Sequence, residues 1–246
     1  MPIILAVLTF LIFIGISCLS DFIKKRFLLK AAEGPVLAAT EATSEMTNPL
    51  RTIAILPSLE EATARVEGYA MPECLYYHQG HAWVAMQDSE TALIGIDEFA
   101  SKLIGRVKSV SVPTVGESFR QGETGWTLRH NGKRLDMVFP LDGKVVAVND
   151  HAVGYPEVLS QEPYGRGWLV MVQSRNLKRN LRNLLRGSVA KRWMEESAAE
   201  LRSLFSGKLG AVFQDGGLPM EGVADHLTDA EWQKLASRIF MVEPMK

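Results

Sequence analysis

Residues Phe139–Asn149 read FPLDGKVVAVN, and this stretch decides the fold. Its apolar run Lys144–Val148 stands between a glycine and an asparagine, which is the pattern of a short strand bounded by turn residues. The stretch also opens the second copy of an internal repeat with an offset of 38 residues. The first copy is Gly105, Val107, Val110, Val115 and Gly116, and the second is Gly143, Val145, Val148, Val153 and Gly154. Five matches at one offset predict two equivalent β units.

Five further short apolar stretches between turn residues are predicted to be strands. They are Ala82–Met86, Thr91–Ile96, Val107–Val112, Met137–Phe139 and Trp168–Val172. Short strands at this spacing favour a sandwich or a barrel. One helix is predicted among them, at Glu98–Leu103. Ahead of them we expect a strand at Thr52–Leu56 and a helix at Leu59–Val66, in which Ser58 and Glu61 would form a capping box.

Three other segments, read in chain order with Phe139–Asn149, carry a family resemblance. They are Tyr77–Val84 (YHQGHAWV), then Gly95–Ala100 (GIDEFA) with Leu103–Gly105 and Pro113–Gly116, and finally Pro156–Leu159 (PEVL) with Glu162–Leu169 (EPYGRGWL). Through them the chain resembles the H protein of the glycine cleavage system, a member of the lipoyl and biotinyl carrier superfamily. The resemblance implies a mainly β fold, a flattened lipoyl-domain-like β barrel of two quasi-symmetric halves (the hybrid motif). It covers only the middle of the chain.

The resemblance also assigns a site, because in that family one lysine at the tip of an exposed hairpin carries lipoate. Aligned without gaps from Pro140, that lysine position falls on Gly132. Asn131–Gly132 is a favoured pair for a two-residue hairpin turn, because both residues tolerate positive φ. We therefore expect the hairpin to remain and the usual attachment point to be absent. Lys133 is the alternative lipoyl attachment point, but a shift of one residue turns a strand side chain to the opposite face.

The predicted hairpin tip is strongly basic. It consists of Arg129, His130, Asn131, Gly132, Lys133 and Arg134. One interpretation is a solvated turn. The other is a docking surface for an acidic partner protein or for anionic lipid headgroups, an attraction that salt would screen.

The N-terminus is predicted to be a transmembrane anchor, because Met1–Ser20 has no charged residue and about 20 apolar residues span a bilayer core. The basic cluster Lys24, Lys25, Arg26 and Lys30 follows this run instead of preceding it, unlike in a secretory signal. By the positive-inside rule we expect the N-terminus outside and the globular domain on the cytoplasmic side of the membrane. The alternative is a buried core helix.

After Gln173 the sequence is predicted to be helical. The first helix, Arg175–Arg186, would be amphipathic, with leucines on one face and basic residues on the other. Its basic residues are Arg175, Lys178, Arg179, Arg182 and Arg186. This face would lie on the membrane surface, or alternatively the leucines would pack on the β domain. A second helix is expected near Val189–Phe205, and a last one after caps at Thr228 and Glu231.

These patterns predict four parts along the chain. They are an anchor at 1–20, a basic flank and tether at 21–74, an H-protein-like β domain at 75–174 and a helical extension at 175–246.

Composition argues against several function classes. A net charge of −1 at pH 7 gives no reason to expect nucleic-acid binding. Two cysteines, Cys18 and Cys74, do not make a disulfide framework or a cysteine-ligated metal site. His78 and His81 are spaced like metal ligands, but no third ligand follows nearby, so we expect no metal. We find no nucleophile–base–acid set, and therefore predict no catalytic residues and a protein that is not an enzyme.

The leading hypothesis is a membrane-anchored, non-enzymatic protein without a cofactor that serves as an accessory or docking subunit of a protein complex. The first alternative is a lipoyl carrier with lipoate on Lys133, which would shuttle aminomethyl or acyl groups or electrons. The second alternative is a scaffold that binds anionic lipid.

Overall fold

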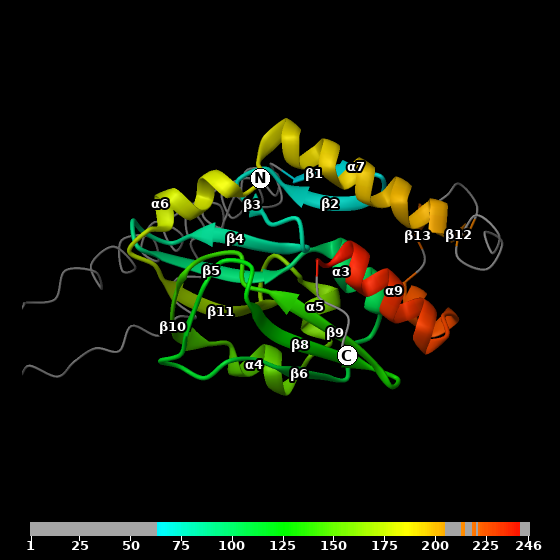
Figure 1. Cartoon of the computed structure of the whole chain (residues 1–246), viewed down its shortest axis with the longest axis horizontal. Helices are drawn as coiled ribbons and strands as arrows, with labels where there is room; N and C mark the ends of the chain where they lie inside the picture. The colour runs from blue at the N-terminus through cyan, green and yellow to red at the C-terminus, as the bar shows by residue number, and fades with distance from the viewer. Residues whose placement is uncertain (1–62, 205–212, 215–217, 220, 242–246) are drawn as a thin grey trace, which may run out of the picture. The chain divides into compact units, whose positions relative to one another are not determined.

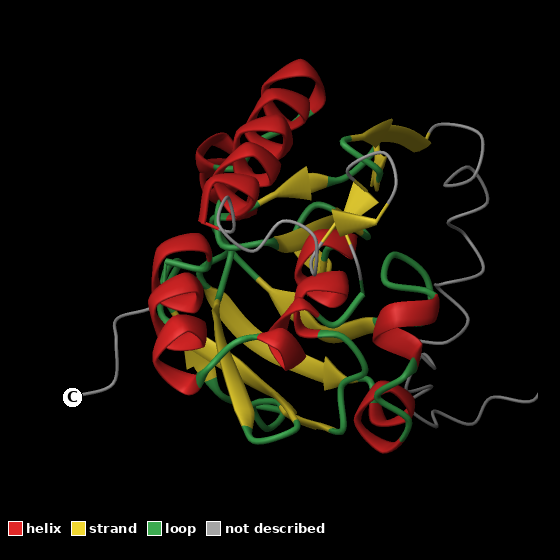
Figure 2. Ribbon diagram, turned by 90° about the vertical axis from the view of Figure 1, so that its right-hand side faces the viewer, coloured by secondary structure: helices red, strands yellow, loops and turns green. Residues whose placement is uncertain are grey.

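The computed structural model describes residues 63–204, 213–214, 218–219 and 221–241, all of which belong to the compact unit Thr47–Lys246. Two sheets form its centre, with the helices outside them (Figures 1 and 2). The larger sheet contains, in spatial order, β3 (Tyr76–Tyr77), β4 (Ala82–Met86), β5 (Thr91–Ile96), β11 (Trp168–Gln173), β10 (Gly143–Val148) and β7 (Ser118–Phe119). The smaller sheet contains β6 (Ser109–Ser111), β8 (Thr124–His130) and β9 (Lys133–Val138). The described domain is therefore mainly β, as expected.

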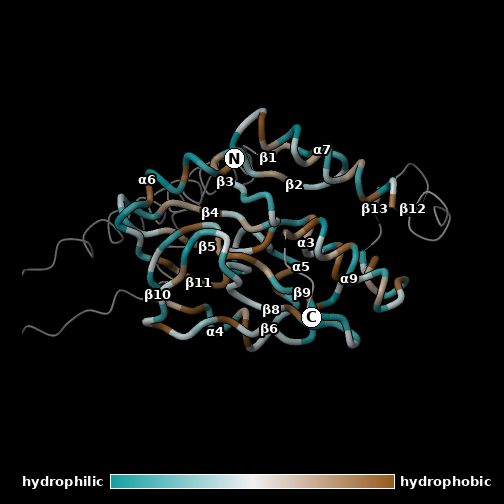
Figure 3. The backbone as a smooth tube through the Cα atoms, in the orientation of Figure 1, coloured by the Kyte–Doolittle hydropathy of each residue, from teal (hydrophilic) through white to brown (hydrophobic). Residues whose placement is uncertain are grey.

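Large apolar side chains from both sheets fill the core. Trp83 and Trp168 from the larger sheet and Trp126 from the smaller one are each at most 1% exposed. Figure 3 shows hydrophobic colouring along β5 and β11, the two central strands of the larger sheet. A Cβ on Gly95 of β5 would lie 2.5 Å from the Trp83 ring, so only glycine fits there.

The predicted strands at Ala82–Met86 and Thr91–Ile96 coincide with β4 and β5. The predicted strand Met137–Phe139 covers only the end of β9. The strand begins at Lys133, and three of the four residues before Met137 are polar, so they form no apolar run.

The internal repeat corresponds to the structure only in part. Val110 lies in β6 and Val148 in β10, but Gly105 follows a helix that ends at Ile104, whereas Gly143 begins β10. After the strands the two copies differ again, since the chain forms a turn at Gly116 but the helix α4 (Asp150–Gly154) in the second copy.

The helix predicted at Leu59–Val66 is wrong in its described part. Residues 63–66 form β1 (Thr63–Val66), which pairs with β2 (Tyr69–Pro72) through a two-residue turn. The turn residues Glu67 and Gly68 have φ of 51° and 84°, the conformation of a tight hairpin turn. The strand predicted at Thr52–Leu56 and the capping box at Ser58 and Glu61 lie outside the described residues.

The single helix predicted at Arg175–Arg186 is also wrong. The segment contains α6 (Leu177–Asn180) and the 3₁₀ turn η1 (Leu181–Asn183), and then becomes extended. Leu185 exchanges two backbone hydrogen bonds of 2.8 Å with Tyr77, which ends the helix. Leu177, Leu181 and Leu184 are buried, so the leucines pack on the β domain, as the alternative interpretation expected.

The remaining helices stand close to their predicted positions. Asp97 caps α3 (Glu98–Ile104) by accepting a 2.8 Å hydrogen bond from the Ala100 N–H. A long helix, α7, covers Gly187–Leu204, and the last, α9, covers Asp229–Ile239 with the predicted Thr228–Glu231 capping box present. The short elements are α5 (Val158–Gln161), β12 (Phe213–Gln214), β13 (Leu218–Pro219) and the 3₁₀ turn η2 (Val223–His226).

The predicted anchor at Met1–Ser20 and its basic flank Lys24–Lys30 lie outside the described residues. Within the described ranges, none of the helices combines the length and the apolar character that a membrane span requires.

Candidate functional site

The candidate site is the tip of the hairpin formed by β8 and β9. His130 faces Lys133 in the register, and Asn131 and Gly132 between them have φ of 43° and 80°. Positive φ at both positions defines the two-residue turn that the Asn-Gly pair predicts, so that prediction is confirmed. A Cβ on Gly132 would meet no atom within 4 Å. The position that the family resemblance assigns to the lipoyl-lysine is therefore open but has no side chain.

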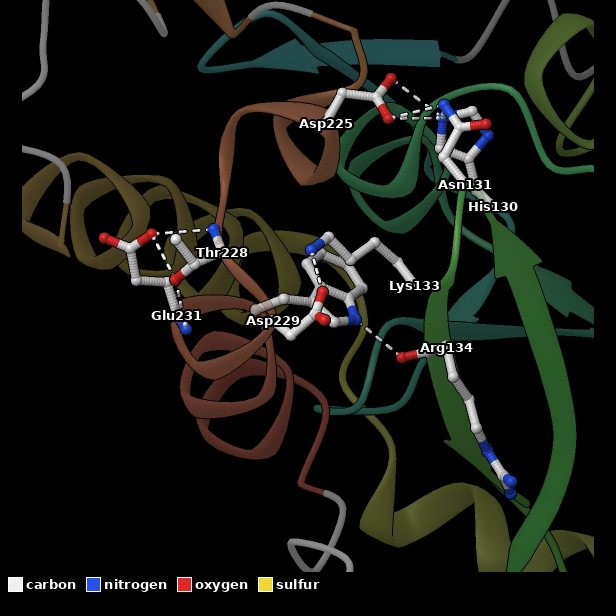
Figure 4. A network of polar contacts seen from close by, with 9 residues as sticks. His130, Asn131, Lys133, Arg134, Asp225, Thr228, Asp229 and Glu231 are labelled. Atoms are coloured by element: carbon white, nitrogen blue, oxygen red, sulfur yellow. Dashed lines mark hydrogen bonds and ion pairs between the residues drawn. The ribbon is translucent and has the colours of Figure 1, made fainter.

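A segment from the end of the chain covers the flanks of this tip. We call residues Glu221–Met241, which contain η2 and α9, the C-terminal cap. Asp225 of η2 contacts the tip directly: its Oδ2 lies 2.9 Å from His130 Nε2, and its Oδ1 accepts a 2.8 Å hydrogen bond from Asn131 Nδ2 (Figure 4). His130 is only 5% exposed as a result.

The first turn of α9 contributes two further contacts. Asp229 forms an ion pair of 2.5 Å with the Lys133 ammonium, whose side chain is only 10% exposed (Figure 4). Trp232 is buried, and its indole N–H donates a 2.7 Å hydrogen bond to the Arg134 carbonyl. The amine nearest to the family's attachment position is thus engaged by a carboxylate of the same chain.

A close backbone contact fixes the start of the cap. The Gly222 N–H donates a 2.8 Å hydrogen bond to the Lys102 carbonyl near the end of α3. A Cβ on Gly105 would lie 2.6 Å from the Gly222 Cα, and Gly105 has a φ of 78°. Glycine is required at position 105 both for this conformation and for the approach of the cap.

Electrostatics favour the contact between tip and cap. The hydrogen bond from His130 is the largest cause that lowers the pKa of Asp225, and the hydrogen bond from Asn131 lowers it further. Asp225 therefore stays ionised to a lower pH than an ordinary aspartate. The basic tip predicted from the sequence faces acidic residues that belong to the chain itself. The other two basic tip residues, Arg129 and Arg134, remain exposed, and Arg134 pairs with Asp136 at 2.9 Å.

A cavity of about 600 Å³ lies between the hairpin, α5 and the cap. His130, Ser160, Glu221 and Asp225 are among the residues that line it. His130 Nδ1 and the Ser160 hydroxyl are buried and have no hydrogen-bond partner among the described residues. The cavity exists only because the cap supplies one of its walls.

His78 and His81 have structural surroundings. His81 Nδ1 lies 2.8 Å from Asp97 Oδ2, and its ring stacks on Phe99 at 4.2 Å. His78 Nδ1 accepts a 3.0 Å hydrogen bond from the Gly80 N–H, which requires an unprotonated nitrogen. Burial, followed by the nearby His81, lowers the pKa of His78 to about 4. In the part of the chain that the structure describes, no group of three or more His, Cys, Asp or Glu could hold a metal ion.

The basic residues predicted to lie at a membrane surface fall into two sets. Those of the basic flank, Lys24, Lys25, Arg26 and Lys30, lie outside the described residues. Those of the C-terminal extension, Arg175, Lys178, Arg179, Arg182 and Arg186, are all exposed. Arg186 stacks over the Tyr76 ring at 4.9 Å and donates a hydrogen bond to its hydroxyl.

The tip as it stands does not fit a lipoyl group. The attachment chemistry needs a free lysine amine at the turn, where this chain has Gly132. Lys133, one residue on, has its amine paired with Asp229 and its side chain largely covered. Neither residue presents an accessible nucleophilic nitrogen at the turn.

The cap residues Asp225, Asp229 and Trp232 are functional-site residues that the sequence reasoning missed. The capping box at Thr228 and Glu231 located α9 but not its position against the hairpin. The only available signal was charge complementarity between the basic tip and an acidic stretch that begins at Asp225, 95 positions after His130. Such a pairing has no periodicity from which it could be predicted.

The family model that matches the chain is the glycine cleavage H-protein, over residues 75–197. A glycine cleavage system H protein of Halothermothrix orenii is 34% identical over 127 residues, which are 51% of this chain and 97% of that protein. A probable glycine cleavage system H protein of Pyrococcus abyssi is 30% identical over 117 residues, 48% of this chain and 87% of that protein.

Among solved structures, a glycine cleavage system H protein of Mycobacterium marinum is similar, with 29% identity and a TM-score of 0.41 over 43% of this chain and 87% of that one. The C-terminal cap, residues 221–241, lies beyond the residues that the family model matches. The match covers half of the chain and nearly the full length of the Halothermothrix relative. The chain therefore belongs to the glycine cleavage H-protein family.

Proposed function

We propose that this chain is a membrane-anchored member of the H-protein family that carries no lipoyl group and serves as an accessory or docking subunit of a protein complex. The observation that carries the proposal is the closed hairpin tip. Gly132 stands at the family's attachment position, and the flanking His130 and Lys133 are held by Asp225 and Asp229 of the C-terminal cap.

A lipoyl carrier and a docking subunit differ in how accessible the hairpin tip must be. A carrier must present its lysine to an attaching enzyme and then to several active sites, so its tip must be accessible. Here the Lys133 amine is paired with Asp229, and the buried Trp232 and the Gly105–Gly222 contact hold the cap that carries this aspartate against the tip. A covered tip does not impair a subunit that transfers no chemical group.

The anchor predicted from the sequence at residues 1–20 is consistent with the same proposal. A diffusible carrier meets its enzymes in solution, whereas a chain fixed to the cytoplasmic face of a membrane works at one place with a bound partner. A docking subunit requires no catalytic residues of its own, which agrees with the non-enzymatic character of an H-protein domain. The partner is expected to be a protein of the same membrane.

The proposal is tested by lipoylation in vitro. The purified full-length chain is incubated with lipoate, ATP and a lipoate-attaching enzyme, with the Halothermothrix H protein as the positive control, and the products are read by mass spectrometry. We expect modification of the control and none of this chain. Lipoate on Lys133 of the wild-type chain would contradict the proposal and support the carrier alternative.

Two variants separate the causes of the expected result. Gly132→Lys restores an amine at the attachment position, where a side chain has open space but a φ of 80° costs about 1–2 kcal/mol. Asp229→Asn frees the Lys133 amine and leaves position 132 unchanged. Modification of Gly132→Lys alone would identify the missing lysine as the cause, whereas modification of Asp229→Asn would identify the cap.

The proposed role as a docking subunit is tested separately, by native gel electrophoresis. In mild detergent extracts of the native membrane, we expect the chain to migrate in a defined assembly larger than itself on native gels. Migration of all of the chain as a single copy would count against a docking subunit.

A further inference from the structure

A strongly basic surface lies on α6 and η1, far from the hairpin tip. Four exposed residues form it, and we call them the basic ridge: Arg175, Lys178, Arg179 and Arg182. None of their side chains forms a hydrogen bond or an ion pair with any other residue that the structure describes. Four neighbouring cations without a partner repel each other, so a ligand that neutralises them would be favoured.

Buried side chains of the same segment fix the backbone of the ridge to the domain. Leu177 and Leu181 are buried in the core, and Asn180 between them is only 3% exposed. The Asn180 amide donates to Asp142 Oδ2 at 2.9 Å and its oxygen accepts from the Ser174 hydroxyl at 3.2 Å. The backbone that carries the four cations is therefore ordered before any ligand arrives, which reduces the entropic cost of binding.

Acidic residues near the ridge have other partners or lie at its edge. Asp142 accepts a hydrogen bond from the Gln121 N–H, the largest cause of its lowered pKa, and a second from Asn180; Arg179 and Arg120 contribute by charge alone. Glu90 lies close to the start of the ridge, where its carbonyl accepts from the Ser174 N–H. Neither carboxylate forms an ion pair with a ridge residue, so the surface keeps its positive charge.

The composition of the surface indicates the kind of partner. The exposed side chains between positions 175 and 183 are arginine, lysine and asparagine, because every leucine of the segment up to Leu184 is buried. Specific protein interfaces have an aromatic or aliphatic centre surrounded by polar residues. A surface with charge and no apolar centre instead suits a broad anionic layer such as lipid headgroups.

We propose that the basic ridge contacts the anionic headgroups of a bilayer and orients the domain on it. Figure 1 shows α6 and the tip of the β8–β9 hairpin at opposite ends of the described domain. Contact through the ridge turns the hairpin tip and the C-terminal cap away from the membrane, toward partners in solution. This orientation follows from surface charge and is independent of whether Lys133 carries a modification.

The test places a fluorescent reporter beside the ridge without changing its charge. Asn176 is exposed and its side chain makes no capping bond to α6, so Asn176→Cys provides the labelling position in a chain with Cys18→Ser and Cys74→Ser. The full chain is added to vesicles of phosphatidylcholine, or of phosphatidylcholine with phosphatidylglycerol, that contain a headgroup-attached quencher. We expect quenching in the anionic vesicles well above that in the neutral ones, and its loss as salt rises.

Two double variants test whether the quenching depends on the ridge residues themselves. Lys178→Gln with Arg182→Gln removes two ridge charges, and each basic residue near an anionic surface is worth about fivefold in binding, so the equilibrium constant for ridge contact should fall by about 25-fold and quenching with it. Arg166→Gln with Arg192→Gln removes two exposed charges elsewhere and should leave quenching unchanged. Equal quenching in both kinds of vesicle, or equal loss in the two double variants, would overturn the proposal. The two double variants have the same residues 1–20. The comparison between them therefore holds whether or not this segment inserts.

Discussion

Replacement of Trp232 by alanine should release the C-terminal cap from the hairpin while the two sheets stay folded. Trp232 is 2% exposed, and its indole N–H donates a 2.7 Å hydrogen bond to the Arg134 carbonyl. The cap meets the smaller sheet through this side chain, through the contacts of Asp225 with His130 and Asn131, and through the ion pair between Lys133 and Asp229. The tryptophan is the largest buried group of α9, so its loss acts first on this contact.

The magnitude follows from burial. Truncation of a buried tryptophan to alanine costs about 3–5 kcal/mol, because the apolar contacts are lost and a cavity remains. A hydrogen bond contributes about 1 kcal/mol of net stability. Trp232→Phe, which keeps most of the apolar contact and loses only the N–H, should therefore cost much less than Trp232→Ala and provides the matched control.

Hydrogen exchange followed by mass spectrometry measures the effect locally. Because about 1.4 kcal/mol corresponds to a factor of ten, amides of η2 and α9 should exchange roughly 100-fold to several thousand-fold faster in Trp232→Ala. Amides of β4, β5 and β11 should change far less. Equal acceleration in the central strands and in the cap would refute the reasoning, since it would show that cap and sheets unfold as one unit.

Three further predictions concern Lys133, His78 and the N-terminal segment. Asp229→Asn should raise the reactivity of Lys133 toward an acylating reagent, measured by peptide mass mapping, whereas Asp150→Asn on α4 should not; unchanged reactivity would mean that the ion pair does not protect the amine. Burial lowers the pKa of His78 to about 4, so the unfolded chain takes up a proton below about pH 6.5 while the folded chain stays neutral; stability is then complete above pH 6.5 and falls by up to roughly 3 kcal/mol as the pH drops to 4. Urea unfolding at pH 7 and pH 5 should show a smaller pH dependence of the unfolding free energy in His78→Gln than in the wild-type chain, and equal pH dependence in the two chains would contradict the assignment. Deletion of residues 1–20 should move the chain from the membrane fraction to the supernatant in carbonate extraction at low anionic lipid content, and retention in the pellet would contradict the anchor.

The sequence predicted those parts of the fold that depend on local patterns. Ala82–Met86 and Thr91–Ile96 are apolar runs between turn residues, and both coincide with strands. Asn131–Gly132 predicted its turn because few residue pairs tolerate positive φ at two consecutive positions. The Thr228–Glu231 capping box located the start of α9 for the same kind of reason: the interaction spans three residues.

Features set by contacts between distant residues were mispredicted. The leucine pattern of Arg175–Arg186 fits a helix, but the backbone pairing of Leu185 with Tyr77 ends it early. Thr63–Val66 has residues acceptable in a helix, yet its pairing with Tyr69–Pro72 makes it a strand. Local propensity amounts to a few tenths of a kcal/mol per residue, so such tertiary contacts override it.

The candidate site was only half predictable. The family resemblance located the tip and identified the glycine at the attachment position. It gave no information on the cap, because residues 221–241 lie outside the part that matches the family. Salt bridges such as Lys133–Asp229 leave no pattern in one sequence, so the tip was expected to be either a solvated turn or a docking surface for another molecule.

The central claim is that the hairpin tip of this H-protein-family member carries no lipoyl group. Mass spectrometry of the Lys133-containing peptide tests it most directly, on the chain isolated from cells with active lipoate synthesis. A lipoylated H protein from the same cells serves as the internal control. The account predicts an unmodified peptide from this chain beside a modified one from the control. A lipoyl adduct on Lys133 would contradict it.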